Sequence, residues 1–225
     1  MSDDNRIAIL GGTGDQGLGL ALRFAKAGRP VVIGSRKEER ALEAAENVKR
    51  QVSGADVLGQ GNAEAATGAG IVILSVPFEH TASTVKGIRD QLEPGQIVVS
   101  MGVPLATAIG DGASKMIGVW QGSCAELVAS LLPKGVHTVS AFQNVSAHRL
   151  QQLEDEVECD VVVSGAKDPR ETVMSLCELV PGLRGINGGV LANARIVEAW
   201  TALLIGMNIR YKVSEGIGVR FTGLD

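Results

Sequence analysis

The sequence predicts an α/β fold, a doubly wound, mostly parallel sheet with a small helical lobe at its C-terminal end. Short apolar runs that are typical of buried strands alternate with amphipathic helical segments. A glycine-rich turn joins the first of these strands to the first helix. With 225 residues, of which 45% are hydrophobic, the chain is long enough to bury the core of such a fold.

The first predicted unit is a strand, a turn and a helix. An apolar run over 6–10 predicts the strand, and apolar residues at helical spacing over 18–25 predict the helix. Between them, Gly12, Gly14 and Gly17 form the pattern G-x-G-x-x-G. The first glycine allows a tight turn, the second lets a pyrophosphate approach the backbone, and the third lets the helix pack close to the strand. Such glycines also occur in turns that bind nothing, but this context favours a Rossmann-type dinucleotide site.

The end of the second predicted strand, 30–34, bears on the choice of cofactor. An Asp or Glu at this point usually binds a free ribose 2′-hydroxyl. This chain instead has Ser35 and Arg36, with Arg40 one helical turn further on. A hydroxyl and guanidinium groups bind a 2′-phosphate, which a carboxylate would repel. The same charges suit a solvated helix start beside Glu38, but the missing acidic residue favours NADP.

The remaining elements continue the alternation. Further strands are predicted at 56–59, 71–76, 96–100, 136–141, 160–164 and 183–186. Helices are predicted at 37–51, 64–68, 81–92, 124–132, 148–156, 168–180 and 191–211. Asp168 is predicted to cap its helix, and Ser123 with Glu126 to form a capping box. The last helix is apolar on most sides, which predicts burial in the domain or against a second subunit.

Three strand ends, near 76–80, 101–105 and 141–147, are predicted to meet where a nicotinamide would lie, because the strand at 71–76 neighbours the first strand. None of them carries an acid–base dyad, a lysine–tyrosine pair or a metal cluster. Reduction of a carbonyl usually needs a proton donor. Hydride transfer between two redox cofactors needs only two rings held face to face. We therefore expect such a transfer, with no catalytic side chain and no metal.

The histidines and cysteines offer few alternatives. His80 is predicted near the nicotinamide, where it either contacts a cofactor phosphate or ribose or orients the following helix. His137 and His148 are expected to be structural. Cys124 opens a helix, a position that favours a thiolate. Because no histidine partner is identifiable for it, an ordinary buried thiol is the favoured interpretation.

Composition excludes several classes of partner. The formal charge is −4 without a basic block, so neither nucleic acid nor an anionic membrane is expected. The three cysteines match no metal motif and suit a reducing cytoplasm. Residues 1–5 are polar and unlike a signal peptide, and the apolar stretch 196–209 is too short to span a bilayer. These features predict a soluble cytoplasmic protein.

Four blocks of the sequence resemble one known family. They cover 10–17, 34–39, 76–80 and 216–221. In this combination and order they resemble the coenzyme F420-dependent NADP oxidoreductases, also called NADPH-dependent F420 reductases, over nearly the whole chain. The resemblance implies direct hydride transfer between C5 of the deazaflavin and C4 of the nicotinamide. It also implies a homo-oligomer, a homodimer or larger.

The resemblance further implies site residues at matching positions. The NADP adenosine and phosphates would be held around Gly12 and Gly14 by Thr13, Asp15, Gln16, Ser35, Arg36 and Arg40. The ribose and nicotinamide would be bordered by Val76, Pro77, His80 and Ala147. The deazaflavin would lie over Gln143, Val145, Thr201 and Ile217. We therefore divide the chain into an NADP-binding domain, 1–188, and a C-terminal helix and tail, 189–225, that complete the second site and a subunit interface.

Two alternatives remain open. The chain could be an NADPH-dependent reductase of another acceptor, such as a flavin, an imine or a chelated metal. It could also be a non-catalytic NADP-sensing module. One departure bears on the acceptor, because some relatives carry histidine where this chain has Gln143. A glutamine amide can hydrogen-bond a deazaflavin carbonyl, but it cannot carry charge.

Overall fold

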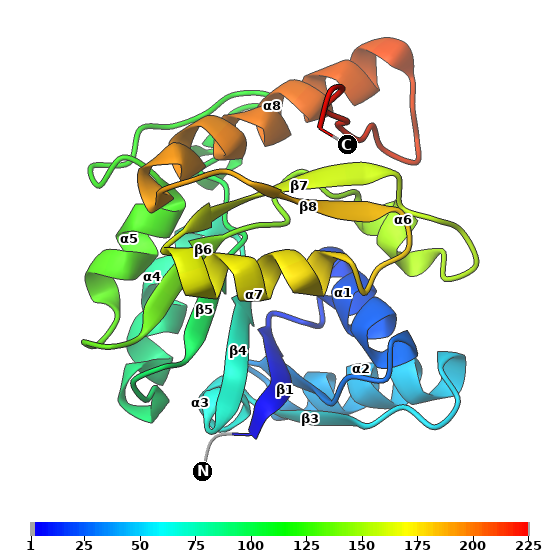
Figure 1. Cartoon of the computed structure of the whole chain (residues 1–225), viewed down its shortest axis with the longest axis vertical. Coiled ribbons are helices and arrows are strands. Elements are labelled where there is room, and N and C mark those ends of the chain that lie inside the picture. Colours follow the sequence, from blue (N-terminus) through cyan, green and yellow to red (C-terminus); the bar gives the residue numbers. More distant parts are fainter. Residues whose placement is uncertain (1–2, 225) are drawn as a thin grey trace.

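The computed structural model describes residues 3–224, in which eight strands form one sheet with helices on both faces (Figure 1). The strands are β1 (Asp3–Leu10), β2 (Val31–Ser35), β3 (Val57–Gly61), β4 (Ala69–Leu74), β5 (Ile97–Ser100), β6 (His137–Ser140), β7 (Cys159–Gly165) and β8 (Leu183–Asn187). The α-helices are α1 (Asp15–Lys26), α2 (Glu38–Gln51), α3 (Asn62–Ala66), α4 (Phe78–Ile88), α5 (Cys124–Leu131), α6 (Ala147–Gln151), α7 (Lys167–Cys177) and α8 (Ala194–Tyr211). Three 3₁₀ helices are η1 (Arg89–Gln91), η2 (Ala106–Ile109) and η3 (Leu191–Asn193).

The strand order confirms the doubly wound, mostly parallel sheet. It runs β3-β2-β1-β4-β5-β6-β7-β8. The first six strands are parallel, β7 is antiparallel to β6, and β8 is parallel to β7. Strand β1 lies between β2 and β4, so the chain reverses its direction of winding at β1 and leaves a crevice at the carboxyl ends of β1 and β4.

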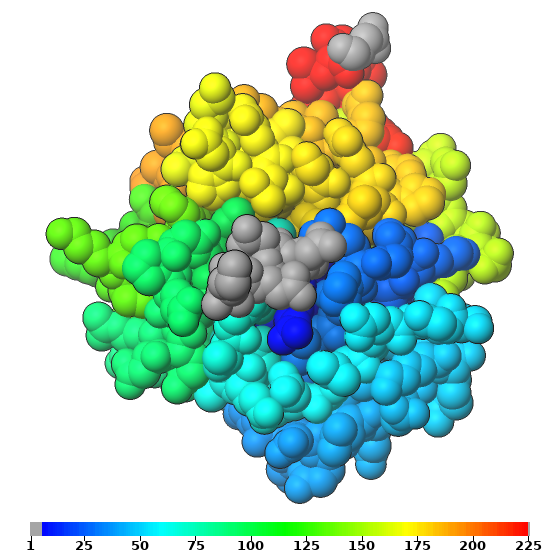
Figure 2. Space-filling view, turned by 60° about the horizontal axis from the view of Figure 1, so that its bottom comes forward, coloured from blue at the N-terminus to red at the C-terminus, as the bar shows by residue number. Residues whose placement is uncertain are grey.

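Alternating side chains divide the core into two layers. In β1, Ile7 and Ile9 join the layer under α1, α2 and α7, whereas Ala8 and Leu10 join the layer under α3, α4 and α5. The register aligns Ile9 with β2 on one side and with β4 on the other, so each layer is continuous across the strands. In Figure 2 the yellow surface of α7 lies above the blue surface of α1, and the red C-terminal residues stand at the top.

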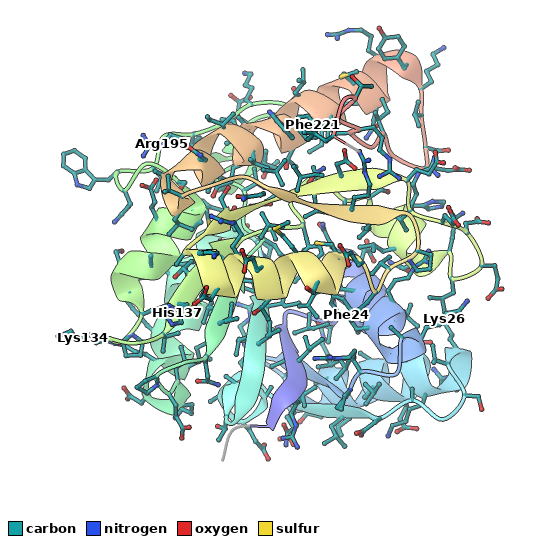
Figure 3. All side chains as sticks on the ribbon, in the orientation of Figure 1. Phe24, Lys26, Lys134, His137, Arg195 and Phe221 are labelled. Carbon is teal, nitrogen blue, oxygen red and sulfur yellow. The ribbon has the colours of Figure 1, made fainter. Side chains whose placement is uncertain are left out.

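The reversal at β7 anchors the C-terminal tail beside the crevice. Because β7 is antiparallel to β6, its first residues lie at the edge where the first six strands end. There the Asn144 amide donates to the Asp160 carbonyl at 2.8 Å. The fully buried Asp160 carboxylate accepts from Arg184 at 2.7 Å, from Arg220 at 2.8 Å and from the Phe221 amide at 2.7 Å. These contacts hold the tail against the start of β7, and Figure 3 shows Phe221 beside α8.

Two helix boundaries differ from the prediction, at the end of α6 and at the start of α7. Helix α6 stops at Gln151 instead of continuing to 156. The buried Arg23 guanidinium donates to the carbonyls of Arg149 and Leu150 at 2.8 Å each, which satisfies the end of the helix. Helix α7 starts at Lys167 with Ala166 as its N-cap, so the prediction that Asp168 is the cap was wrong.

A third helix boundary differs from the prediction and places His80 inside a helix. Helix α4 starts at Phe78, directly after Pro77, and not at 81 as predicted. Proline is favourable at a helix start because the amide hydrogen it lacks would have no partner there. His80 therefore lies in the first turn of α4 and not before the helix.

Helix α8 is only partly buried in this chain. Val197, Glu198 and Leu204 are buried, whereas Ile196 and Leu203 on another face are 58% and 59% exposed. The C-terminal turn exposes Ile209 as well. The predicted burial is therefore found on one side of the helix within the chain. None of the helices in residues 3–224 is long and apolar enough to cross a membrane.

Candidate functional site

The turn between β1 and α1 is built for close backbone approach. Gly11 has φ +78°, and a Cβ added there would lie 2.3 Å from the Ser75 carbonyl oxygen. The sequence pattern attributed the tight turn to Gly12, but the left-handed conformation belongs to Gly11. At Gly14 the nearest atom to an added Cβ is at 3.5 Å, and the first amides of α1 begin directly after it. Such free N–H groups at a helix start suit a phosphate.

Gly17 lets α1 pack against the turn, as its place in the pattern predicted. A Cβ there would lie 2.7 Å from the Gly12 Cα and 2.8 Å from the Gly11 carbonyl oxygen. Since both neighbours are backbone atoms, Gly17→Ala should destabilise the chain by about 1–3 kcal/mol and weaken NADPH binding. Urea unfolding and an NADPH titration measure the two effects.

Gly87 provides the control for this substitution. It lies within α4, and no atom lies within 4 Å of an added Cβ. We expect Gly87→Ala to leave NADPH binding unchanged and to stabilise the chain slightly, because alanine favours helix. Equal effects of the two substitutions would contradict the assignment of Gly17.

The first cavity of the crevice, about 540 Å³, carries positive charge. Ser35 lies at the end of β2, where its hydroxyl accepts from the Lys37 amide at 3.2 Å. Arg36, just before α2, and Arg40, in its first turn, also line the cavity, as does His80 of α4. Among the described residues that line it, none is acidic. The hydroxyl of Ser35 and the guanidinium groups of Arg36 and Arg40 therefore fit a phosphorylated ribose. Thr13 and Gly14 of the glycine-rich turn line the same cavity.

The second cavity, about 450 Å³, adjoins the first. The two share Gly14 and residues 75–77, the segment between β4 and α4. Asp15, Gln16 and residues 101–103 are among the other residues that line it. The Gln16 amide donates to the carbonyls of Phe142 at 2.9 Å and Val145 at 3.1 Å. Gln16 thus holds the turn after β6 against the start of α1.

The third cavity, about 310 Å³, adjoins the second through Gln16, Gln143 and Thr201. It is lined by residues after β6, by α8 and by the tail residues Gly216 and Ile217. The three cavities therefore form one continuous cleft along the carboxyl ends of the parallel strands.

Gln143 stands at the junction between the second and third cavities. Its amide nitrogen donates to the Ser140 hydroxyl and to the Ser100 carbonyl, the latter at 3.4 Å. Its own backbone carbonyl accepts from the Thr201 hydroxyl at 2.9 Å. The residue as a whole is 4% exposed. Its amide donors are thus used within the protein, and a bond from them to a deazaflavin carbonyl would compete with these partners.

All but one of the predicted site residues line this cleft. The first cavity contains Thr13, Gly14, Ser35, Arg36, Arg40, Val76, Pro77 and His80. The second and third contain Asp15, Gln16, Gln143, Val145, Ala147, Thr201 and Ile217. The exception is Gly12, which is buried beneath the turn, where an added Cβ would lie 2.9 Å from the Ile9 carbonyl oxygen.

The cleft also contains residues that the sequence patterns missed. They include Asn62, Thr84, Thr107, Leu204, Ile205 and Asn208. His148, expected to be structural, lines the third cavity, whereas His137 lies at the exposed start of β6, away from the cleft (Figure 3). These positions follow from tertiary packing, and no local motif marks them.

Cys124 is an inert thiol in this arrangement. It is fully buried at the start of α5, and Ser123 caps the helix by accepting from the Glu126 amide at 3.0 Å. Burial, and secondarily the charge of Glu198, raises the pKa of Cys124 to about 11. The structure therefore agrees with a buried thiol and not with a nucleophile. Among the described residues, no three His, Cys, Asp or Glu side chains gather as a metal site would require.

Comparison with known proteins identifies the family. Residues 6–104 match the family model described as NADP oxidoreductase coenzyme F420-dependent. The F420-dependent NADP reductase of Methanocaldococcus jannaschii is 48% identical over 98% of this chain and 99% of its own length. The chain belongs to the F420-dependent NADP reductase family. The member from Methanothermobacter thermautotrophicus is 43% identical over 97% of this chain and 95% of its own length.

Solved structures agree on the fold of this family member. A crystal structure from Arthrobacter sp., provisionally assigned as an F420-dependent NADP reductase, has a TM-score of 0.78 and 21% identity, and the match covers 96% of this chain and 99% of that one. An imine reductase from Streptomyces aurantiacus has a TM-score of 0.57 and 15% identity over 91% of this chain and 62% of its own. At these identities the likeness concerns the fold alone.

Proposed function

We propose that the chain transfers hydride between NADP(H) and the deazaflavin coenzyme F420. Membership of the F420-dependent NADP reductase family supports this function. The observation that carries it in this molecule is the continuous cleft of three adjoining cavities. Such a cleft offers two ring systems a common space at the carboxyl edge of the sheet.

The first cavity would hold the adenosine half of NADP. Arg36 and Arg40 would pair with the 2′-phosphate, and the Ser35 hydroxyl would add a neutral hydrogen bond. The pyrophosphate would meet the amides at the start of α1 beside Thr13 and Gly14. Val76, Pro77 and His80 would border the ribose and nicotinamide.

The third cavity would take the deazaflavin. Val145 and Ile217 offer apolar contacts, and Gln143 and Thr201 separate this cavity from the nicotinamide side. Bound NADP and F420 supply the hydride donor and acceptor themselves. The contribution of the chain would be to hold the rings together and exclude water, because direct hydride transfer between two rings depends on their proximity and orientation.

The two-part organisation belongs to this proposal. Residues 1–188 would bind NADP, and residues 189–225 would complete the deazaflavin site. The exposed apolar residues of α8, among them Ile196 and Leu203, would pack against a second copy of the chain. A cytoplasmic location would suit both soluble cofactors. Light scattering at several concentrations tests the proposed self-association.

A panel of acceptors tests the function against its main alternative. NADPH is mixed in a stopped-flow instrument with oxidised F420, and separately with FMN and a cyclic imine. We expect rapid bleaching of the deazaflavin band and no turnover with the other two. Turnover of FMN or the imine without deazaflavin reduction would favour the alternative acceptor. NADPH binding without any turnover would favour a sensing module.

A further inference from the structure

Glu198 is a buried carboxylate that joins two helices. It lies on α8 and is 1% exposed. Its two oxygens accept from the backbone amides of Cys124 at 2.9 Å and Ala125 at 3.1 Å. These are the first two residues of α5, which have no partner for their N–H groups within their own helix. A side chain more than 70 residues away in the sequence thus completes the start of α5.

The same side of α8 forms part of the proposed deazaflavin cavity. Thr201 lies one turn after Glu198 and donates to the Gln143 carbonyl at 2.9 Å. Two turns further on, the Asn208 side chain accepts from the Ile217 amide at 2.9 Å. Three polar contacts therefore align one face of α8 with α5, with the turn after β6 and with the tail. Of the three, only the contact of Glu198 is a carboxylate held by two backbone amides.

We propose that Glu198 is a positioning residue, which holds α8 against α5 and thereby sets the wall of the deazaflavin cavity that Thr201 forms. The proposal rests on the proposed function for the identity of the ligand. Glu198 does not line any of the three cavities of the cleft, so it acts through the helix and not by touching a cofactor. The cavity proposed for the adenosine half of NADP contains no residue of α8, so Glu198 should affect NADPH affinity much less than F420 affinity.

Protonation of Glu198 should change how strongly α8 is held against α5. Burial is the main cause that raises the pKa of Glu198 to about 7, the charge of Glu126 adds to it, and the two backbone amides oppose it. A carboxyl with a raised pKa binds a proton more readily in the docked helix than in an exposed one. Docking is therefore favoured by protonation and weakens as pH rises from the ordinary value of 4.5 through about 7.

Few other ionisable groups among the described residues act on this carboxyl. On α5, the charge of Glu126 raises the pKa of Glu198, and Cys124 lies beside it with its backbone amide bonded to the carboxylate. Arg195 of α8, which Figure 3 labels, pairs with Glu126 at 3.1 Å. Thr81 of α4 and Ser100 of β5 contact the Cys124 sulfur and carry no charge. The neighbouring η3 has the sequence Leu-Ala-Asn and is uncharged.

Hydrogen exchange of the unliganded chain tests the proposal directly. In the wild type, protection factors of the α8 amides should fall as pH rises from 6 to 8. Glu198→Gln mimics the neutral acid, keeps one acceptor and should remove this pH dependence while α8 stays protected. Glu198→Ala removes both acceptors and should lower α8 protection at every pH. If the alanine variant fails to fold, the glutamine variant still decides the question.

Ligand binding separates positioning from general stability. For Glu198→Ala we expect the Kd of F420 to rise about tenfold and the Kd of NADPH to change by less than about twofold. Arg195→Ala is the matched control, because it removes an exposed ion pair between the same two helices and should leave both Kd values nearly unchanged.

Three results would overturn the proposal. They are equal losses of F420 and NADPH affinity in Glu198→Ala, unchanged α8 protection in that variant, and a wild-type pH dependence retained in Glu198→Gln. Absence of F420 binding by the wild type would instead contradict the proposed function. The exchange measurement on the unliganded chain would then still decide the role of Glu198.

Discussion

Arg36→Glu is expected to raise the Kd of NADPH by about 100-fold while changing the Kd of NADH by less than about threefold. A charge-assisted bond from guanidinium to phosphate contributes about 1.5–3 kcal/mol, and the introduced carboxylate adds repulsion. NADH lacks the 2′-phosphate and so loses neither interaction. Arg36 follows β2 and lines the first cavity, which is proposed for the adenosine. None of the described residues that line this cavity is acidic. Isothermal titration with both nucleotides gives the two affinities.

Lys49→Glu is a suitable control for this substitution. It reverses one positive charge in the same way at the far end of α2, where Lys49 pairs with Glu46 at 2.9 Å on the surface. We expect it to leave both nucleotide affinities unchanged. Equal loss of NADPH and NADH affinity in Arg36→Glu would remove the assignment of the 2′-phosphate to this cavity.

Asp160→Asn is expected to lower the free energy of unfolding by about 2–4 kcal/mol, because it leaves two guanidinium groups without their buried carboxylate partner. Asp160 is fully buried, whereas Arg184 and Arg220 are 41% and 38% exposed, so water compensates in part. Loss of this anchor also frees the tail that carries Ile217 to the third cavity. Urea unfolding and F420 titration of the variant measure the two consequences.

The stability that Asp160 contributes should depend on pH in a definite direction. Hydrogen bonds from Arg184 are the main cause that holds the pKa of Asp160 well below its ordinary value of 3.8, and burial opposes them. A carboxyl whose pKa is lower in the folded than in the unfolded chain stabilises the fold at pH values above its ordinary pKa. This stabilisation is lost as pH falls toward the pKa of the folded state. The difference between wild type and Asp160→Asn should therefore narrow below about pH 3.8.

An exposed carboxylate provides the comparison. Asp111 also has a lowered pKa, caused first by its hydrogen bond to Lys115, but it lies on the surface. Asp111→Asn should change stability little, because water solvates both groups when the pair is lost. A similar loss of stability in the two variants would contradict the special role of the buried Asp160.

Local patterns in the sequence were sufficient for the parallel part of the sheet and for the residues that line the first cavity. Apolar runs marked the strands, and the residues after β1, β2 and β4 could be placed on one edge because parallel strands share a direction. Ser35 and Arg36 were found in this way. The left-handed turn residue was assigned one position too late, to Gly12 instead of Gly11, because adjacent glycines leave the choice open without coordinates.

The third cavity, proposed for the deazaflavin, depends on contacts between distant segments, which sequence periodicity does not encode. Gln143 and Thr201 were placed there through a family resemblance and not through a local pattern. The antiparallel turn of β7, which puts Asp160 beside the site, has no signature in an apolar strand. Glu198 interrupts an apolar helix, and only the structure reveals that it completes the start of α5.

The most direct test of the account follows one hydrogen atom. NADPH carrying deuterium on the transferred position of its C4 is mixed with oxidised F420 in ordinary water, and the reduced deazaflavin is analysed by mass spectrometry. Direct transfer between two rings in one cleft predicts that the deuterium appears on C5 of the product. A product that carries hydrogen from the solvent would contradict direct transfer, and an unreduced deazaflavin beside bound NADPH would contradict the proposed acceptor.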